Sequence, residues 1–287
     1  FVQLNLNITR DKIMTLISIL LVLLVERVTT KSKYWQARFY TDKYLQSIQS
    51  QGWFDSSSKS WVLALIIFVP VIIVYLVVQK FAGGLLELII STAILMICVG
   101  CPAIRATYKC FLQAANRGDL QACSMYEDQI NGDDKETVSF GLSLVWQNYR
   151  HYTAVILWFA ACGAAGVILY VLIRELDARL SNDNDPIGNQ VKRLLNIVDW
   201  IPVRITALGF LLVGHFSRAF PTWLGYLPDP AVQAKTLLLD VSKKAEEIEP
   251  DESDCTEEPC TLVRLAKRNV MFLLVIIALL TLTGWIS

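Results

Sequence analysis

The sequence predicts an all-α protein, a polytopic membrane helix bundle of four to six membrane-embedded segments with amphipathic helices at the surface. Of its 287 residues, 54% are hydrophobic and 18% are charged, whereas an average soluble domain has roughly 25% charged residues. Several stretches without a charged residue approach the roughly 20 residues that cross a bilayer as a helix. The polar stretches between them carry apolar residues at helical spacing.

Four apolar stretches are predicted to span the membrane. They cover residues 61–78, 88–99, 152–173 and 270–286, and none contains a charge. The first includes Pro70, which membrane helices tolerate because neighbouring groups satisfy the freed backbone. The second stretch, 88–99, extends to 84–101 if Glu87 lies at the membrane interface.

Two further stretches are left open by the sequence. Residues 13–25 are apolar but short, so a short span, a re-entrant piece and an interfacial helix all fit. Residues 201–216 are interrupted by Arg204, and a central arginine costs roughly 2.5–3.5 kcal/mol on insertion scales. This second stretch is therefore expected at the interface or packed inside the bundle.

The remaining sequence divides into polar segments. Residues 105–130 are predicted to form an amphipathic helical pair that breaks at 116–119, with Gly118 as the C-cap of the first helix and Asp119 as the N-cap of the second. Residues 14–287 are expected to form one membrane domain with a polar region at 174–268. Residues 1–13 precede Met14 and are treated as an upstream segment outside the fold, whether or not they are native.

Lysine and arginine near the span ends indicate orientation. Five of them precede residue 61, which puts that segment and residues 105–150 on the cytoplasmic side. Basic residues also crowd both ends of 174–268, so the side of this region stays open. The basic residues are Lys31, Lys33, Arg38, Lys43 and Lys59, and then Arg174, Arg179, Arg264, Lys267 and Arg268.

Composition and cysteine spacing exclude several classes of function. The net charge is zero, which gives no bulk attraction to nucleic acid. Cys98 and Cys101 form a C-x-x-C pattern without a second pair at metal-binding spacing, so packing is the favoured interpretation. Cys255 and Cys260 flank an acidic loop and would pair only in an oxidising compartment. No metal site and no cofactor is predicted.

Charged residues at membrane depth are the candidate ligand-binding groups. Asp199 is predicted to N-cap a helix with Pro202 in its first turn, which leaves Arg204 in need of a partner. The polar run 147–151 lies directly before a span and can reach headgroups or a ligand. The candidate cleft comprises Glu26, Arg27, Asp119, Asn148, Arg150, Asp199 and Arg204. No catalytic residue is assigned.

Several strings resemble the AmpE family, and the resemblance runs from Met14 to the end of the chain. It implies a multi-pass protein of the bacterial inner membrane, linked to β-lactamase induction and to sensing of cell-wall recycling. Its implied partners are the lipid bilayer and an amphiphilic or cell-wall-derived ligand, and a homo-oligomer is an open alternative. The strings are 14–27, AANRGD at 114–119, VWQNYR at 145–150, VDWIPVR at 198–204, GH at 214–215 and AFPTW at 219–223.

The AmpE family is in turn distantly similar to the CbiB/CobD family of cobalamin biosynthesis. The Gly118–Asp119 turn and residues 199–204 look like the shared parts, whereas that family's His-Pro motif in the early loop is missing here. The resemblance implies an alternative to signalling, a membrane enzyme that forms an amide bond or performs a phosphate-dependent transfer in a cleft at the membrane surface. A structural partner subunit is a third alternative.

Overall fold

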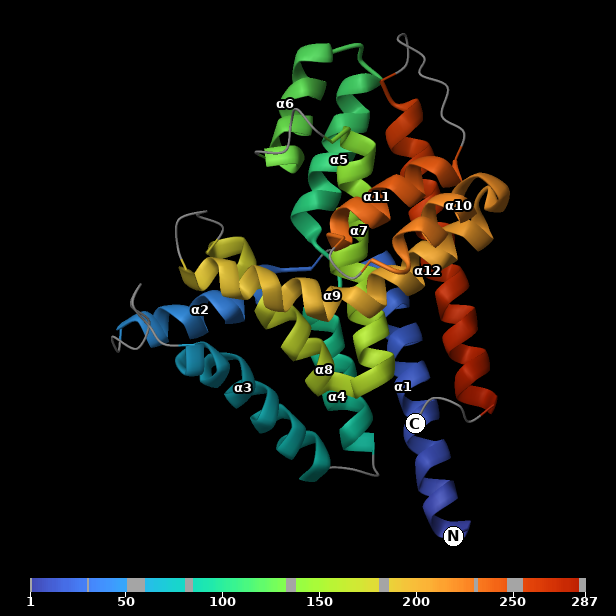
Figure 1. Ribbon diagram of the computed structural model, residues 1–287. Coiled ribbons are helices and arrows are strands. Elements are labelled where there is room, and N and C mark those ends of the chain that lie inside the picture. Colours follow the sequence, from blue (N-terminus) through green and yellow to red (C-terminus); the bar gives the residue numbers. More distant parts are fainter. Residues whose placement is uncertain are drawn as a thin grey trace. The chain divides into compact units, whose positions relative to one another are not determined.

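The regular structure in the described part of the chain is all helical, with no strand (Figure 1). The computed structural model describes residues 2–29, 31–50, 60–80, 85–132, 138–180, 186–229, 232–246 and 255–283. The predicted all-α class is confirmed. The helices are α1 (Val2–Val28), η1 (Lys33–Trp35), α2 (Ala37–Ser50), α3 (Ser60–Lys80), α4 (Leu85–Cys98), α5 (Pro102–Ala115), α6 (Leu120–Asn131), α7 (Phe140–Asn148), η3 (Tyr149–Thr153), α8 (Ala154–Arg179), α9 (Pro186–Val213), α10 (Phe216–Tyr226), α11 (Ala234–Ala245) and α12 (Glu257–Thr283).

Four helical stretches among the described residues are long and apolar enough to cross a membrane: Trp61–Lys80, Phe140–Arg179, Ile187–Val213 and Glu257–Thr283. They contain the predicted spans 61–78 and 152–173 and most of 270–286, whose last residues lie outside the described part. Residues 201–213 of the open stretch 201–216 form the end of a 27-residue candidate span, because the helix starts at Pro186.

The helix at the predicted span 88–99 does not meet the length criterion for a span by itself. Helix α4 has 14 residues and passes the span criterion only together with α5, from which it is bent by 46°. Pro102 at the start of α5 cannot continue the backbone ladder of α4, so the helix restarts there. Residues 13–25 lie within α1, and whether they cross the membrane stays a prediction.

Two breaks interrupt the long helix from Phe140 to Arg179. A π-helical turn, η3, covers Tyr149–Thr153. Further on, Gly163 has φ +62° and ψ −153°, a non-helical conformation that kinks α8. This positive φ favours glycine, so the kink falls at a residue that can adopt it without strain.

The chain divides into two compact units. The first contains residues 1–99, 155–199 and 276–287. In it α1 packs along α4, and Thr92 Oγ1 donates to Ser18 Oγ at 3.0 Å between them. Tyr44 of α2 donates to Ile66 O of α3 at 3.0 Å, and Arg179 of α8 pairs with Asp42 of α2.

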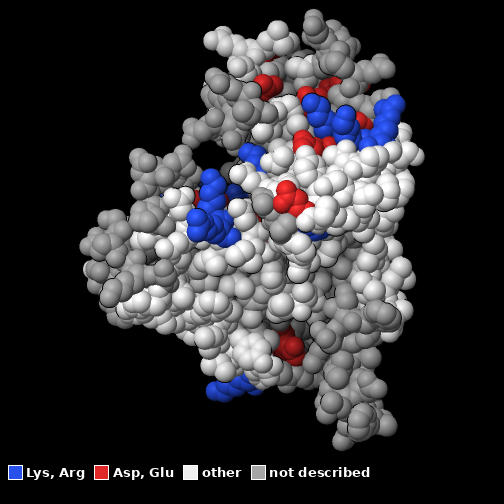
Figure 2. Space-filling view, viewed as in Figure 1, with Lys and Arg blue, Asp and Glu red and all other residues white. Residues whose placement is uncertain are grey.

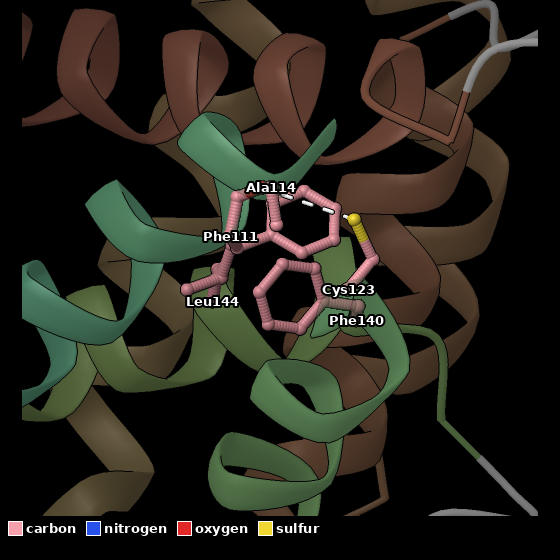
Figure 3. Packing of buried hydrophobic residues seen from close by; sticks show 5 residues of the cluster. All are labelled: Phe111, Ala114, Cys123, Phe140 and Leu144. Carbon is pink, nitrogen blue, oxygen red and sulfur yellow. Dashed lines mark hydrogen bonds between the residues drawn. The ribbon is translucent and has the colours of Figure 1, made fainter. Parts of the chain in front are cut away.

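The second unit contains residues 100–154 and 200–275. Its α5–α6 hairpin packs on α7 around a core cluster of Phe111, Ala114, Cys123, Phe140 and Leu144 (Figure 3). The rings of Phe111 and Phe140 lie 4.5 Å apart, tilted by 50°. The hairpin is therefore held by aromatic packing.

The predicted helical pair at 105–130 is confirmed with one change. Gly118 has φ +71°, but the C-cap is Asn116. The glycine instead turns the chain so that Asp119 N donates to Ala114 O at 3.1 Å. Asp119 is the predicted N-cap, since its carboxylate accepts from Ala122 N at 3.0 Å.

Candidate functional site

Among the described residues of the first unit, three side chains that are charged at neutral pH are buried in helices. Glu26 of α1 is 7% exposed, Arg174 of α8 is 4% exposed and Asp199 of α9 is 1% exposed. A buried charge costs several kcal/mol unless it is paired, and all three have polar or electrostatic partners. Ionisable groups retained at this cost inside membrane helices are functional candidates.

A group of charged side chains lies near the end of α4, and we call Lys31, Cys98, Arg174 and Glu175 the Cys98 cluster. Cys98 and Arg174 are buried, and Lys31 and Glu175 are partly buried. The charges of Arg174, Lys31 and Glu175 act on the Cys98 thiol. Arg174 donates from Nη2 and Nε to Glu175 Oε1 at 2.9 and 3.3 Å. The cluster thus offers a guanidinium, an ammonium, a carboxylate and a thiol in one region with little solvent.

Lys31 of this cluster also closes α4. Its Nζ donates to Met96 O and Val99 O, at 2.5 Å each. A cation at these last carbonyls complements the dipole of the helix. Sequence reasoning used Lys31 and Arg174 only for orientation and missed the cluster. Its only sequence signal is the adjacent Arg174–Glu175 pair at the end of a charge-free run.

The partners of Arg204 lie within the second unit. Its guanidinium lies over the Trp200 ring at 4.1 Å and donates to Trp200 O at 3.2 Å, to Asp229 O at 3.1 Å and to Tyr226 O at 3.5 Å. Trp223 Nε1 donates back to Arg204 O at 3.4 Å. Arg204 is buried, and its contacts link the C-terminal end of α10 to α9.

The prediction that Asp199 caps a helix is wrong. Helix α9 runs without a break from Pro186 to Val213, so Asp199 and Pro202 lie in its interior. Pro202 cannot donate to the carbonyl one turn earlier. The helix continues because an interior proline is tolerated in membrane helices, where other groups satisfy the freed carbonyl.

Asn148 and Arg150 flank the start of the π-helical turn η3 in the second unit. The Arg150 guanidinium lies 5.8 Å from the ring of Trp146, which stacks on Tyr149 at 5.3 Å. His151 O accepts from Gly100 N at 2.9 Å. Single π turns recur at functional sites because they re-aim the side chains of a helix.

The seven predicted cleft residues fall into both units. Glu26, Arg27 and Asp199 belong to the first, and Asp119, Asn148, Arg150 and Arg204 belong to the second. Arg27 is exposed and Asp119 is an exposed N-cap, so both have ordinary surface roles. That the seven share one cleft stays a prediction.

All seven cysteines are free thiols, including Cys255 and Cys260 at the ends of the acidic loop. Residues 247–254, the acidic stretch just before Cys255, lie outside the described part. Cys260 Sγ lies 3.5 Å from Tyr108 Oη. Among the residues described, no three His, Cys, Asp or Glu side chains lie close enough together to hold a metal ion.

Comparison with known proteins gives one family over nearly the whole chain. The family model described as "Regulatory signalling modulator protein AmpE" matches residues 14–287. "Protein AmpE" of Shigella flexneri is 26% identical over 286 residues, covering 94% of this chain and 99% of that protein.

Two proteins named "Cobalamin biosynthesis protein CobD" are similar over a smaller part. The one from Chromobacterium violaceum is 29% identical over 55% of this chain and 56% of its own length. The one from Stutzerimonas stutzeri is 24% identical over 65% of this chain and 63% of its own length. No solved structure matches. With its apolar helices and a family match that leaves out only residues 1–13, the chain is a multi-pass membrane protein and belongs to the AmpE family of regulatory signalling modulators.

Proposed function

We propose that this protein modulates β-lactamase induction and the response to cell-wall recycling from the bacterial inner membrane. The observation that carries the proposal is the family match over 14–287. The similarity to the Shigella flexneri protein, which covers 99% of that relative, supports it. A signalling modulator must bind a ligand whose concentration changes. Polar groups within apolar helices are candidates for binding such a ligand.

We infer that a cell-wall-derived or other amphiphilic ligand is recognised by buried charged side chains. The candidates are the buried charged residues of the predicted cleft, Glu26, Asp199 and Arg204, together with the Cys98 cluster. Burial strengthens an ionic contact to a ligand because water does not screen it. Glu26 is the candidate that can be tested most directly. Its neighbour Arg27 is exposed and therefore provides a matched control.

The test is deletion of the gene in a host with inducible β-lactamase, followed by complementation. We expect the deletion to change β-lactamase activity after induction and the muropeptide pool, and the intact gene to restore both. Glu26→Gln should fail to restore them, whereas Arg27→Gln should succeed at equal membrane abundance. A deletion that changes neither readout would reject the proposal, and equal behaviour of the two variants would reject the role of Glu26.

The second candidate is a membrane enzyme of the CobD type, favoured by the similarity to the two cobalamin biosynthesis proteins. It is tested by introducing the gene into a host that lacks CobD and needs cobalamin synthesis for growth. Restored growth would establish this function, and unchanged auxotrophy with the protein present in the membrane would exclude it.

A further inference from the structure

Helix α10 begins directly after a candidate span. Helix α9 ends at Val213 and α10 starts at Phe216, so Gly214 and His215 alone connect them. A Cβ on Gly214 would meet Ala245 of α11, and His215 N donates to Ala245 O at 2.7 Å. A segment that close to the end of a span lies at the membrane surface, whichever side of the membrane it is on.

The outer face of α10 is apolar and aromatic. Phe216, Phe220 and Leu224 repeat every fourth residue and are 47%, 36% and 50% exposed. The rings of Phe216 and Phe220 stack at 5.1 Å, and Trp223 follows at 6.3 Å from Phe220. At 100° per residue the three exposed residues cover an arc of about 80°, beside the arc on which Ala219 is buried.

The sector of the helix next to this face is suited to water. Ser217, Arg218, Pro221 and Gly225 are exposed and together cover about 100° of the circumference. The helix therefore has three sectors, one packed on the protein, one apolar and exposed, and one polar or small and exposed. Such a division is typical of a helix that lies in the plane of a membrane interface.

Contacts at both ends fix this orientation within the second unit. At the C-terminal end, Arg204 binds Tyr226 O and Asp229 O, and Tyr226 Oη donates to Asp240 of α11 at 2.6 Å. Helix α9 has an exposed apolar face of its own, where Ile201, Ile205 and Leu212 are exposed. Figure 2 shows that wide areas of the visible surface carry no charged side chain.

We propose that α10 lies in the membrane interface, with Phe216, Phe220 and Leu224 among the lipid acyl chains and the Ser217–Arg218 side in the headgroup water. The partner of this face is the lipid bilayer itself. Aromatic side chains are enriched at this depth because their rings prefer the boundary between hydrocarbon and water. The proposal does not depend on β-lactamase signalling.

The test is photo-crosslinking of the full chain in vesicles made of phosphatidylethanolamine with a minor share of phosphatidylglycerol. Benzoylphenylalanine replaces Phe220 in one sample and Leu224 in a second, so that one poorly folded variant does not decide the result. Ile205 is the positive control for lipid contact, and Ser217 is the matched control on the water side of the same helix.

We expect mass spectrometry to find several-fold more lipid adduct at Phe220 and Leu224 than at Ser217, at a level similar to that at Ile205. Equal adduct at Phe220, Leu224 and Ser217 would overturn the proposal. Crosslinks from Phe220 or Leu224 to a second copy of the chain would also overturn it, because the apolar sector would then be a protein interface.

Discussion

The close approach of α9 and α12 depends on a single glycine. Asn269 is fully buried, and its Nδ2 donates to Thr206 O at 3.1 Å. A Cβ on Gly209 would clash with Asn269 Oδ1. The amide cannot move away freely, because a shift would break the bond to Thr206 O. Glycine therefore gives room for a polar contact between two candidate spans, as small residues do in membrane bundles.

We predict that Gly209→Ala destabilises the protein but that its effect changes sign when Asn269 is also replaced by alanine. Overpacking costs up to about 3 kcal/mol, and alanine gains about 1 kcal/mol over glycine in a helix, so the single variant should lose about 2 kcal/mol. Asn269→Ala alone should lose about 1 kcal/mol with its hydrogen bond. In that background the new methyl group has room, and Gly209→Ala should gain up to about 1 kcal/mol.

The assay is equilibrium unfolding of the detergent-solubilised protein in increasing dodecyl sulfate, followed by circular dichroism. Gly225→Ala is the control, since nothing lies within 4 Å of its Cβ position. The reasoning would be refuted if Gly209→Ala had the same effect in both backgrounds within about 0.5 kcal/mol, the usual limit of additivity.

Three further predictions use other contacts. Arg204→Met should lower the free energy of unfolding by about 1–3 kcal/mol, because the carbonyls at the end of α10 lose their buried donor. An unchanged melting temperature would show that these hydrogen bonds of Arg204 do not stabilise the protein. The hydrogen bond from Tyr226 to Asp240, together with burial, raises the pKa of the Tyr226 hydroxyl. The stability from this bond should therefore be complete below pH about 10, the unfolded value, and be lost as the pH rises through the raised pKa. Tyr226→Phe should remove that loss in an alkaline unfolding titration, and a persisting loss would implicate another group. Asp119→Ala should cost about 1 kcal/mol through the lost N-cap, whereas Asp119→Ser should retain most of the stability in the same unfolding assay.

The pH dependence of folding stability expected from the Glu127 carboxyl has the opposite sign to that of a carboxylate in an ion pair. Burial raises its pKa, and Asp128 and Glu258 raise it further. Because the folded value exceeds the unfolded value of about 4.3, protonation of Glu127 favours the folded state. Its contribution is present at acidic pH and is lost as the pH rises through the raised pKa. Glu127→Gln should flatten this acid-side dependence in the unfolding assay.

The sequence determined the features that depend on local composition. Charge-free length predicted spans at 61–78 and 152–173, and helical spacing with Gly118 and Asp119 predicted the α5–α6 hairpin and its N-cap. The strings spread from Met14 to Trp223 indicated the family that the comparison then showed. These signals are visible in sequence because hydrophobic length, capping and turn chemistry act within a few residues.

The tertiary structure decided the roles that depend on distant partners. Capping by Asp199 was a sound local prediction, yet the flanking residues continue the helix on both sides. Trp200 is a local partner of Arg204, but its other two acceptors, Tyr226 O and Asp229 O, lie 22 and 25 residues away, and Lys31 reaches α4 across 65 residues. In the sequence, a charged residue within an apolar stretch indicates only that it needs a partner, because burying an unpaired charge is costly. Which residue is the partner depends on how the helices pack.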